Sequence, residues 1–99
     1  MAGEDAQIIL KDARPVGFVM SRIDAAEITL LQFYIMPEHQ GRGIGSAALD
    51  LLLRHWVGEH KPVTLGVLRN NPAQRLYERF GFRPVGQTPM KLLMRREPD

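Results

Sequence analysis

Hydrophobic residues recur along this chain with two different periods, and the change of period separates predicted strands from predicted helices. In the first third, short runs rich in β-branched and aromatic residues alternate with polar turns, a pattern typical of antiparallel strands. From Ile44 the apolar residues recur every three or four positions, as they do on one face of a helix. We therefore expect an antiparallel meander and then a helix that Gly58 ends as a left-handed cap. The three strands are expected at residues 6–11, 15–22 and 27–36.

The second half of the chain continues with alternating strands and helices. A strand expected at residues 62–69 should lie parallel to the third strand and beside it, because a helix connects the two. The next helix has Asn71 as a suitable N-cap, Pro72 at its first position and Gly81 as a suitable left-handed residue after its end. Tyr77 lies on its apolar stripe and is expected to face the sheet. Two last strands are expected at residues 82–85 and up to Met94, with a turn at residues 86–89.

Composition limits the kinds of protein that this sequence can be. With 99 residues, 44% of them hydrophobic and 24% charged, we expect one domain over residues 1–99. The predicted elements make it an α/β fold, a mixed sheet with an antiparallel meander followed by a βαβα unit. The absence of cysteine excludes a catalytic thiol. No apolar run is long enough to span a membrane and the acidic start is unlike a signal peptide, so we expect a cytoplasmic protein.

Charge and histidine spacing argue against two kinds of site. The net charge of +2 is small, and the basic residues are not interleaved with aromatic residues, so we expect no nucleic-acid partner. No membrane partner is expected either. The histidines at positions 39, 55 and 60 lack the spacing of metal ligands, so no metal site is expected.

Three glycines lie in the segment 40–46, between the third predicted strand and the first predicted helix. Glycine lets a ligand approach the backbone, and the unpaired N–H groups of a first helical turn attract anions. Arg42 and Ser46 add a charge and a hydroxyl, so the segment is a candidate phosphate-binding site. A nucleoside-triphosphate loop requires a lysine directly after its last glycine, where this chain has Ser46. A dinucleotide-binding loop requires an acidic residue at the end of the next strand, which here ends in Arg69.

Two segments together closely resemble the GNAT superfamily of acetyl-CoA-dependent N-acetyltransferases. The first is Gln40-x-x-Gly43-x-Gly45, which follows a strand that ends in YIMP. The second, VLRNNPAQRLYERFGF, resembles the family pattern N-x-x-A-x-x-L-Y-x-x-x-G-F. The resemblance covers residues 6–96 and implies a GNAT-like fold, acetyl-CoA as cosubstrate and a primary amine as acceptor. The second pattern is matched by Asn70, Ala73, Leu76, Tyr77, Gly81 and Phe82.

The resemblance also implies a role for each matched position. The backbone of residues 40–46 would hold the pyrophosphate, and the edge of the third strand would pair with the pantetheine arm. Tyr77 would be the general acid that protonates the departing thiolate. The backbone N–H of Ile35 would stabilise the oxyanion. The implied cofactor-binding residues are Phe33, Tyr34, Ile35, Gln40, Gly41, Arg42, Gly43, Ile44, Gly45, Ser46 and Asn70.

The residues themselves leave other interpretations open. Tyr77 also has the spacing of a core aromatic residue, and Asn70 could simply begin a helix. Glu27 is the nearest carboxylate candidate for the general base, although family members often place a glutamate about two residues further along, where this chain has Thr29. Water relayed by strand carbonyls or by Gln32 is the alternative.

Typical members of the family begin with a strand and helices that form the wall of the acceptor site, and here only a few residues precede the first strand. We therefore expect a homodimer in which a neighbour covers the open face of the sheet. The acceptor is expected to be a small amine or a protein lysine or N-terminal amine. The alternative function is a module that binds coenzyme A or acyl-CoA without efficient catalysis, and a small nucleotide-binding domain is a third, weaker interpretation. The sequence leaves open which amine is the acceptor and whether the chain is a fragment.

Overall fold

Three long strands begin the chain, as the alternating hydrophobic pattern predicts. In the computed structural model, which describes residues 3–98, β1 spans Gly3–Lys11, β2 spans Arg14–Ile23 and β3 spans Ile28–Ile35. Each strand pairs antiparallel with the next, so the predicted meander is confirmed. β1 begins three residues earlier than expected because its polar start pairs with the end of β2, where Arg22 lies 3.6 Å from Glu4.

The parallel unit follows the meander. α1 (Ile44–Trp56) connects β3 to β4 (Val63–Leu68), and the two strands pair in parallel, as predicted. Between β3 and α1 the chain makes a 3₁₀ turn, η1 (Pro37–His39), which the periodicity did not indicate. Neither α1 nor any other described helix has the length and apolar character that crossing a bilayer requires.

The end of α1 differs from the prediction. The helix tightens after Trp56 into a 3₁₀ turn, η2 (Val57–Glu59), so the chain passes through Gly58 without reversing. The left-handed residue is His60, with φ of 54°, and its N–H donates to the Val57 carbonyl. The prediction that Gly58 is the left-handed cap was therefore wrong, because the 3₁₀ turn moves the reversal two residues along the chain.

The second helix begins and ends close to the residues that its sequence indicates. α2 spans Ala73–Arg79, and the side-chain oxygen of Asn71 accepts a hydrogen bond of 2.9 Å from the Ala73 N–H. Gly81 follows the helix with φ of 91°, a conformation that glycine adopts without strain. The capping by Asn71 and the terminating glycine are thus confirmed, whereas Pro72, expected at the first helical position, directly precedes α2.

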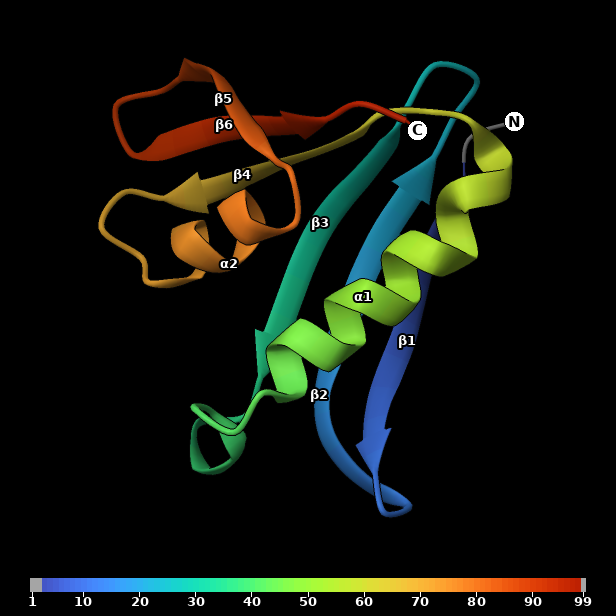
Figure 1. Cartoon of the computed structure of the whole chain (residues 1–99), viewed down its shortest axis with the longest axis vertical. Helices are drawn as coiled ribbons and strands as arrows, with labels where there is room; N and C mark the ends of the chain where they lie inside the picture. The colour runs from blue at the N-terminus through green and yellow to red at the C-terminus, as the bar shows by residue number, and fades with distance from the viewer. Residues whose placement is uncertain (1–2, 99) are drawn as a thin grey trace.

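The last two strands form a hairpin and complete one six-stranded sheet in the order β1-β2-β3-β4-β6-β5 (Figure 1). β5 spans Arg83–Gln87 and β6 spans Lys91–Arg96. β5 is longer than expected and the turn falls later, because Gln87 pairs with Leu92 and the Thr88 N–H donates to the Lys91 carbonyl at 2.8 Å. β6 lies between β4 and β5 and is antiparallel to both.

The hydrophobic core lies between one face of the sheet and the two helices. Leu49 of α1, Phe82 after α2 and Ile28 of β3 are each fully buried in one cluster. In Figure 1 both helices lie on the near side of the sheet, and no described helix covers its other face. There the rings of Phe18 and Tyr34 pack against each other with centroids 5.5 Å apart.

Candidate active site

β3 and β4 separate after only three paired residues. Ile28–Leu30 pairs with Val63–Leu65, and beyond Leu30 the two strands have no partner residues in common. The separation begins at a β-bulge, because the pairing of β3 with β2 skips Leu31. A bulge bends and twists its strand, so Leu31 directs the rest of β3 away from β4. We call the space between the two strands beyond Leu30 the gap.

The far end of β3 offers backbone groups to the gap. The Met36 N–H donates to the Val16 carbonyl of β2 at 2.8 Å, and Gly17 is the residue opposite Ile35. In an antiparallel ladder this pattern makes Ile35 and Gly17 a pair without hydrogen bonds, so the N–H and C=O of Ile35 point away from β2. The Ile35 carbonyl accepts a hydrogen bond of 2.8 Å from Nε2 of Gln40. The Ile35 N–H therefore points into the gap, where no described residue accepts a hydrogen bond from it.

The glycine segment presents further N–H groups at the start of α1. Gly41 and Gly43 have φ of 75° and 77°, and a Cβ at either position would meet no atom within 4 Å. These two glycines are therefore required by backbone conformation and not by crowding within the protein. The first backbone hydrogen bond of α1 runs from the Ala47 N–H to the Gly43 carbonyl, at 3.1 Å. No described carbonyl accepts the N–H groups of residues 44–46, which leaves these donors available to an anion.

α2 packs against this helix end. A Cβ at Gly45 would lie 3.6 Å from Cδ2 of Leu76, which is an ordinary van der Waals distance. The Nη2 atom of Arg79 donates a hydrogen bond to the Ser46 hydroxyl over 3.2 Å. Arg79 thus places a positive charge beside the free N–H groups of α1. Sequence reasoning missed this residue because it lies 33 positions after Ser46 and outside the glycine segment.

Tyr77 borders the gap from α2. Its side chain is 6% exposed, it packs edge-to-face against Phe82, and it lines a cavity of about 260 Å3 between β3 and β4. No described residue forms a hydrogen bond with its hydroxyl. Every fully buried side-chain polar atom among residues 3–98 has a partner, so the Tyr77 hydroxyl is not fully buried. The hydroxyl therefore opens onto the cavity. Burial raises the pKa of Tyr77 from 10.0 to about 12, so the phenol keeps its proton at neutral pH.

Hollows lie on both faces of the sheet beside the gap. Gln32 and Phe33 line the cavity beside Tyr77, and the same two residues line a hollow of about 460 Å3 on the opposite face. Phe18 and Tyr34 form the rest of that hollow. Molecules that approach from opposite faces can therefore reach the same stretch of β3.

Two predicted site residues lie outside this arrangement. Glu27 precedes β3, in a turn where its N–H donates to Oδ1 of Asp24, and it lines neither the cavity nor the hollow. Asn70 is an exposed left-handed residue with φ of 66°, whereas its neighbour Asn71 lines the cavity. The structure brings Tyr77 together with β3 and the glycine segment, but it brings neither Glu27 nor the Asn70 side chain to the gap. Residues 3–98 contain no cluster of three His, Cys, Asp or Glu side chains suited to a metal ion.

Arg42 lies at the solvent side of the glycine segment. It is exposed, and it lines a hollow of about 500 Å3 together with Lys11, Arg14 and His39. Asp12 is the one acidic side chain in that lining. The surroundings of the glycine segment are therefore mainly basic, which suits a phosphate-bearing ligand.

Comparison with known proteins identifies the family. The sequence matches the Acetyltransferase (GNAT) domain over residues 3–84. The chain belongs to the GNAT family of acetyltransferases. Two curated relatives are the Spermine/spermidine N(1)-acetyltransferase of Bacillus subtilis strain 168 and the Probable spermine N(1)-acetyltransferase of B. subtilis subsp. natto strain BEST195. Each is 36% identical over 63 residues, which cover 61% of this chain and 41% of the relative.

Solved structures share the GNAT fold of this chain. PaiA N-acetyltransferase from Thermoplasma acidophilum, in complex with coenzyme A, has a TM-score of 0.84 at 22% identity, covering 95% of this chain and 60% of that one. The ribosomal-protein-S18-alanine N-acetyltransferase from Escherichia coli has a TM-score of 0.78 at 22% identity, covering 89% and 64%. This GNAT chain thus spans 41% of the length of the curated relatives that it matches.

The residues around the gap fit acetyl-CoA, the cosubstrate that membership of the GNAT family implies. The pyrophosphate requires donors and positive charge, and the first turn of α1 supplies free N–H groups next to the Arg79 guanidinium. Segment 40–46 contains no acidic residue that would repel phosphate. The pantetheine arm carries amide groups, which match the N–H of Ile35 and the open edge of β3.

Proposed function

We propose that this chain transfers an acetyl group from acetyl-CoA to a primary amine by direct transfer within a ternary complex. The observation that carries the proposal is the gap, which Gln32 and Phe33 border on both faces of the sheet. The cosubstrate would occupy the cavity on the side of Tyr77, and the amine would enter from the hollow beside Phe18 and Tyr34. The two reactants then meet at β3 without a covalent enzyme intermediate, which agrees with the absence of cysteine.

Binding would use main-chain groups and one arginine. The N–H groups of residues 44–46 and the guanidinium of Arg79 would hold the pyrophosphate. Bound acetyl-CoA supplies the activated acetyl group. The Ile35 N–H would donate to the carbonyl oxygen of that group, where negative charge develops during attack. The side chain of Gln40 donates a hydrogen bond to the Ile35 carbonyl, which points to the same side of β3 as the Ile35 N–H. This hydrogen bond would help to hold the Ile35 N–H in place.

Protons would move at two places around the gap. As the amine nitrogen bonds to the acetyl carbon and the carbon–sulfur bond breaks, the Tyr77 hydroxyl would donate its proton to the sulfur. The raised pKa of Tyr77 keeps this proton in place until the thiolate forms. The proton that the amine loses would pass to water beside Gln32, and solvent would return a proton to Tyr77. Glu27 remains a candidate base only through a longer chain of water, because it does not line the gap.

The acceptor is proposed as a small amine or an exposed protein lysine or N-terminal amine. The names of the relatives refer to spermine, spermidine and a ribosomal-protein alanine, which all offer an amino group. A hollow that is open to solvent admits either kind of acceptor. The cytoplasmic location expected from the sequence stays a prediction.

Thiol release with a panel of amines tests the proposal. Acetyl-CoA would be incubated with the chain and with spermidine, a simple monoamine, a lysine peptide or a peptide with N-terminal alanine, and free thiol would be measured by absorbance. Because the chain has no cysteine, the protein itself gives no thiol background. We expect release above the enzyme-free rate with at least one amine. The alternative, a binding module, would be supported if acetyl-CoA stabilises the fold while no amine raises thiol release.

A thermal-shift control separates acetyl-CoA from other nucleotides. A ligand at 100 times its dissociation constant adds about 2.7 kcal/mol to the free energy of unfolding. Acetyl-CoA should raise the melting temperature, and ATP and NAD should not. A shift with NAD alone would favour the nucleotide-binding interpretation instead.

A further inference from the structure

β1 is an edge strand of the sheet, and no strand among residues 3–98 pairs with its outer side. It pairs only with β2, over all nine of its residues, and it contains no proline. The irregularity in this pairing is an extra residue on β2, Val16, so β1 itself is continuous. Ile8 and Leu10 are 63% and 60% exposed. A long, continuous edge strand with exposed apolar side chains is a template for pairing with another strand.

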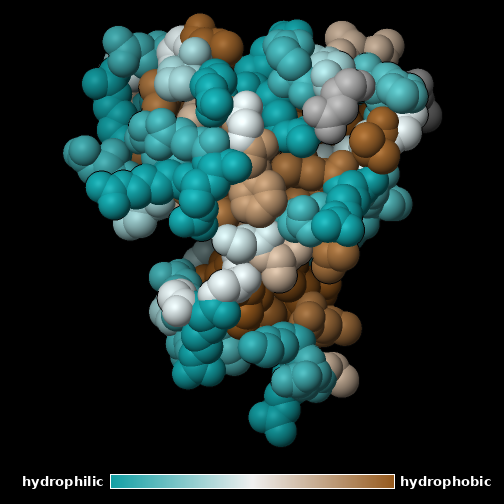
Figure 2. Space-filling view, viewed as in Figure 1, coloured by the Kyte–Doolittle hydropathy of each residue, from teal (hydrophilic) through white to brown (hydrophobic). Residues whose placement is uncertain are grey.

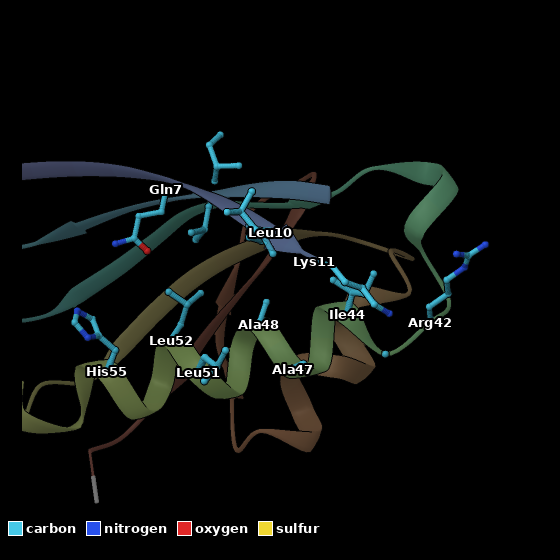
Figure 3. A pocket seen from close by; sticks show the side chains of 14 residues that line it. Gln7, Leu10, Lys11, Arg42, Ile44, Ala47, Ala48, Leu51, Leu52 and His55 are labelled. Atoms are coloured by element: carbon cyan, nitrogen blue, oxygen red, sulfur yellow. The ribbon is translucent and has the colours of Figure 1, made fainter. Parts of the chain in front are cut away.

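An apolar groove runs beside this edge. It has a volume of about 610 Å3 and lies between β1 and α1. In Figure 3 Ala48 and Leu52 of α1 lie below β1, with His55 and Gln7 toward one end of the groove and Lys11 and Arg42 toward the other. Leu51 of α1 is 68% exposed at this groove. Figure 2 shows hydrophobic surface on the side of the molecule where α1 and β1 lie.

Two-fold symmetry restricts how two copies of β1 could pair. Strands of one antiparallel sheet are related by an axis perpendicular to the sheet, and residues opposite each other point to the same face. Because side chains alternate between the two faces, two opposite residues must both have even numbers or both have odd numbers. In an antiparallel pair the sum of their numbers is constant, so this sum must be even. The axis must therefore pass through one residue, which lies opposite its own copy.

Charge selects one of these registers. With the axis at Ile8, Asp5 lies opposite Lys11 of the second copy, and this favourable contact occurs twice. With the axis at Gln7, Asp5 lies opposite Ile9, and Lys11 lies opposite Gly3. Among the described residues of β1, only the register at Ile8 places opposite charges across from each other. Opposite-charge pairs stabilise an antiparallel pair, and Ile8 meeting its own copy adds an apolar contact at the centre.

We propose that the β1 edge is a self-association surface, at which two copies pair antiparallel around a two-fold axis at Ile8 to form one continuous sheet. A perpendicular axis keeps the α1 helices of both copies on the same face of that sheet. The two grooves then lie next to each other, and the exposed Leu51 of each copy faces the shared apolar space. This dimer differs from the one expected from the sequence, in which a neighbour covers the open face. It does not depend on the proposed function, because β2 and β3 separate β1 from the gap.

The oligomeric state of Ile8→Lys tests the location of the surface. Ile8 is exposed, so the substitution leaves the fold intact while placing two ammonium groups opposite each other at the axis. Val85 is the matched control, since it is 62% exposed on β5, the other edge strand. Sedimentation at about 50 μM should give twice the chain mass of 11.2 kDa for the parent and for Val85→Lys, and the chain mass for Ile8→Lys. A monomeric parent, or an Ile8→Lys protein that remains dimeric, would overturn the proposal.

A charge reversal tests the register. Asp5→Lys alone and Lys11→Asp alone each place like charges opposite each other twice, so each should weaken the dimer at least 10-fold. The double variant Asp5→Lys/Lys11→Asp restores opposite charges and should recover most of the lost affinity. Circular dichroism of every variant checks that the fold is retained. Single variants that dimerise as the parent does, or a double variant as weak as the single ones, would exclude the register at Ile8.

Discussion

The guanidinium of Arg79 donates a hydrogen bond to the Ser46 hydroxyl over 3.2 Å, and this contact joins the last turn of α2 to the first turn of α1. Both residues border the free N–H groups at which the pyrophosphate is proposed to bind. α2 therefore contributes to the proposed binding of acetyl-CoA as well as to its chemistry. The helix that carries Tyr77 also carries this charge two residues later, about half a turn further on.

The first prediction follows from this contact. Arg79→Gln should weaken the binding of coenzyme A about 10-fold, because a charge-assisted hydrogen bond contributes about 1.5–3 kcal/mol. The loss should shrink as salt is raised from 50 to 500 mM, since salt screens the lost charge. Arg75→Gln is the matched control, an exposed arginine on the same helix that has no contact with Ser46. Calorimetry that shows equal affinities for both variants would contradict the assignment.

The second prediction concerns Gly45. A Cβ there lies at ordinary distances from Leu76 and Ile35, so Gly45→Ala should fold with nearly unchanged stability. The methyl group would lie in the first turn of α1, where the pyrophosphate is proposed to approach the backbone, so we expect at least 10-fold weaker binding of acetyl-CoA. Gly58→Ala is the control, because a Cβ there meets nothing within 4 Å and the residue is far from the gap. If Gly45→Ala binds as tightly as Gly58→Ala, the first turn of α1 is not the phosphate site.

The third prediction separates catalysis from packing at Tyr77. Tyr77→Phe keeps the ring contact with Phe82 and removes a hydroxyl that forms no hydrogen bond with a described residue. Turnover should fall about 100-fold, while affinity for acetyl-CoA changes less than 3-fold. The comparison requires single-turnover kinetics, so that acyl transfer and not product release is measured. An unchanged rate of acyl transfer would assign Tyr77 to the core and protonation to water.

The fourth prediction uses the titration of the same residue. Burial raises the pKa of Tyr77 to about 12, whereas the unfolded chain ionises near 10.0. Above pH 10 the unfolded state loses a proton that the folded state keeps, so stability falls as pH rises from 10 to 12 and is unaffected below. Between pH 9 and 11 the parent should lose about 1.4 kcal/mol more than Tyr77→Phe in urea unfolding. Equal losses would mean that the Tyr77 hydroxyl is as solvated as in the unfolded chain.

Much of the fold could be predicted because it depends on local signals. The change from alternating to helical spacing at Ile44 marks the passage from meander to parallel unit. Asn71 and Gly81 delimit α2 through backbone chemistry that acts within a few residues. Prediction fails where two ways of ending a helix compete. After α1 the chain could reverse at Gly58 or continue into a short 3₁₀ turn, and it continues and reverses at His60.

The site was predictable to a smaller extent, because its geometry depends on contacts between distant segments. The glycine segment and Tyr77 carry their own sequence patterns, and the structure brings both to the gap, while their roles stay predictions. The contact from Arg79 to Ser46 spans 33 residues, and the bulge at Leu31 is set by the pairing of β2 with β3. The bulge also decides which residues face the gap, and it leaves Glu27 where β3 and β4 are still side by side. The spacing of residues within one segment of the sequence cannot indicate that β3 and β4 separate beyond Leu30.

The separation of β3 from β4 has a consequence for how such a protein can change over evolutionary time. Beyond Leu30 the groups that β3 offers are N–H and C=O, which every residue except proline possesses. In the proposed ternary complex, amino-acid replacements along residues 31–35 would therefore alter the shape presented to the amine while the groups offered to acetyl-CoA persist. A strand of this kind permits new acceptors to arise one side chain at a time, without a stage at which the cosubstrate is lost.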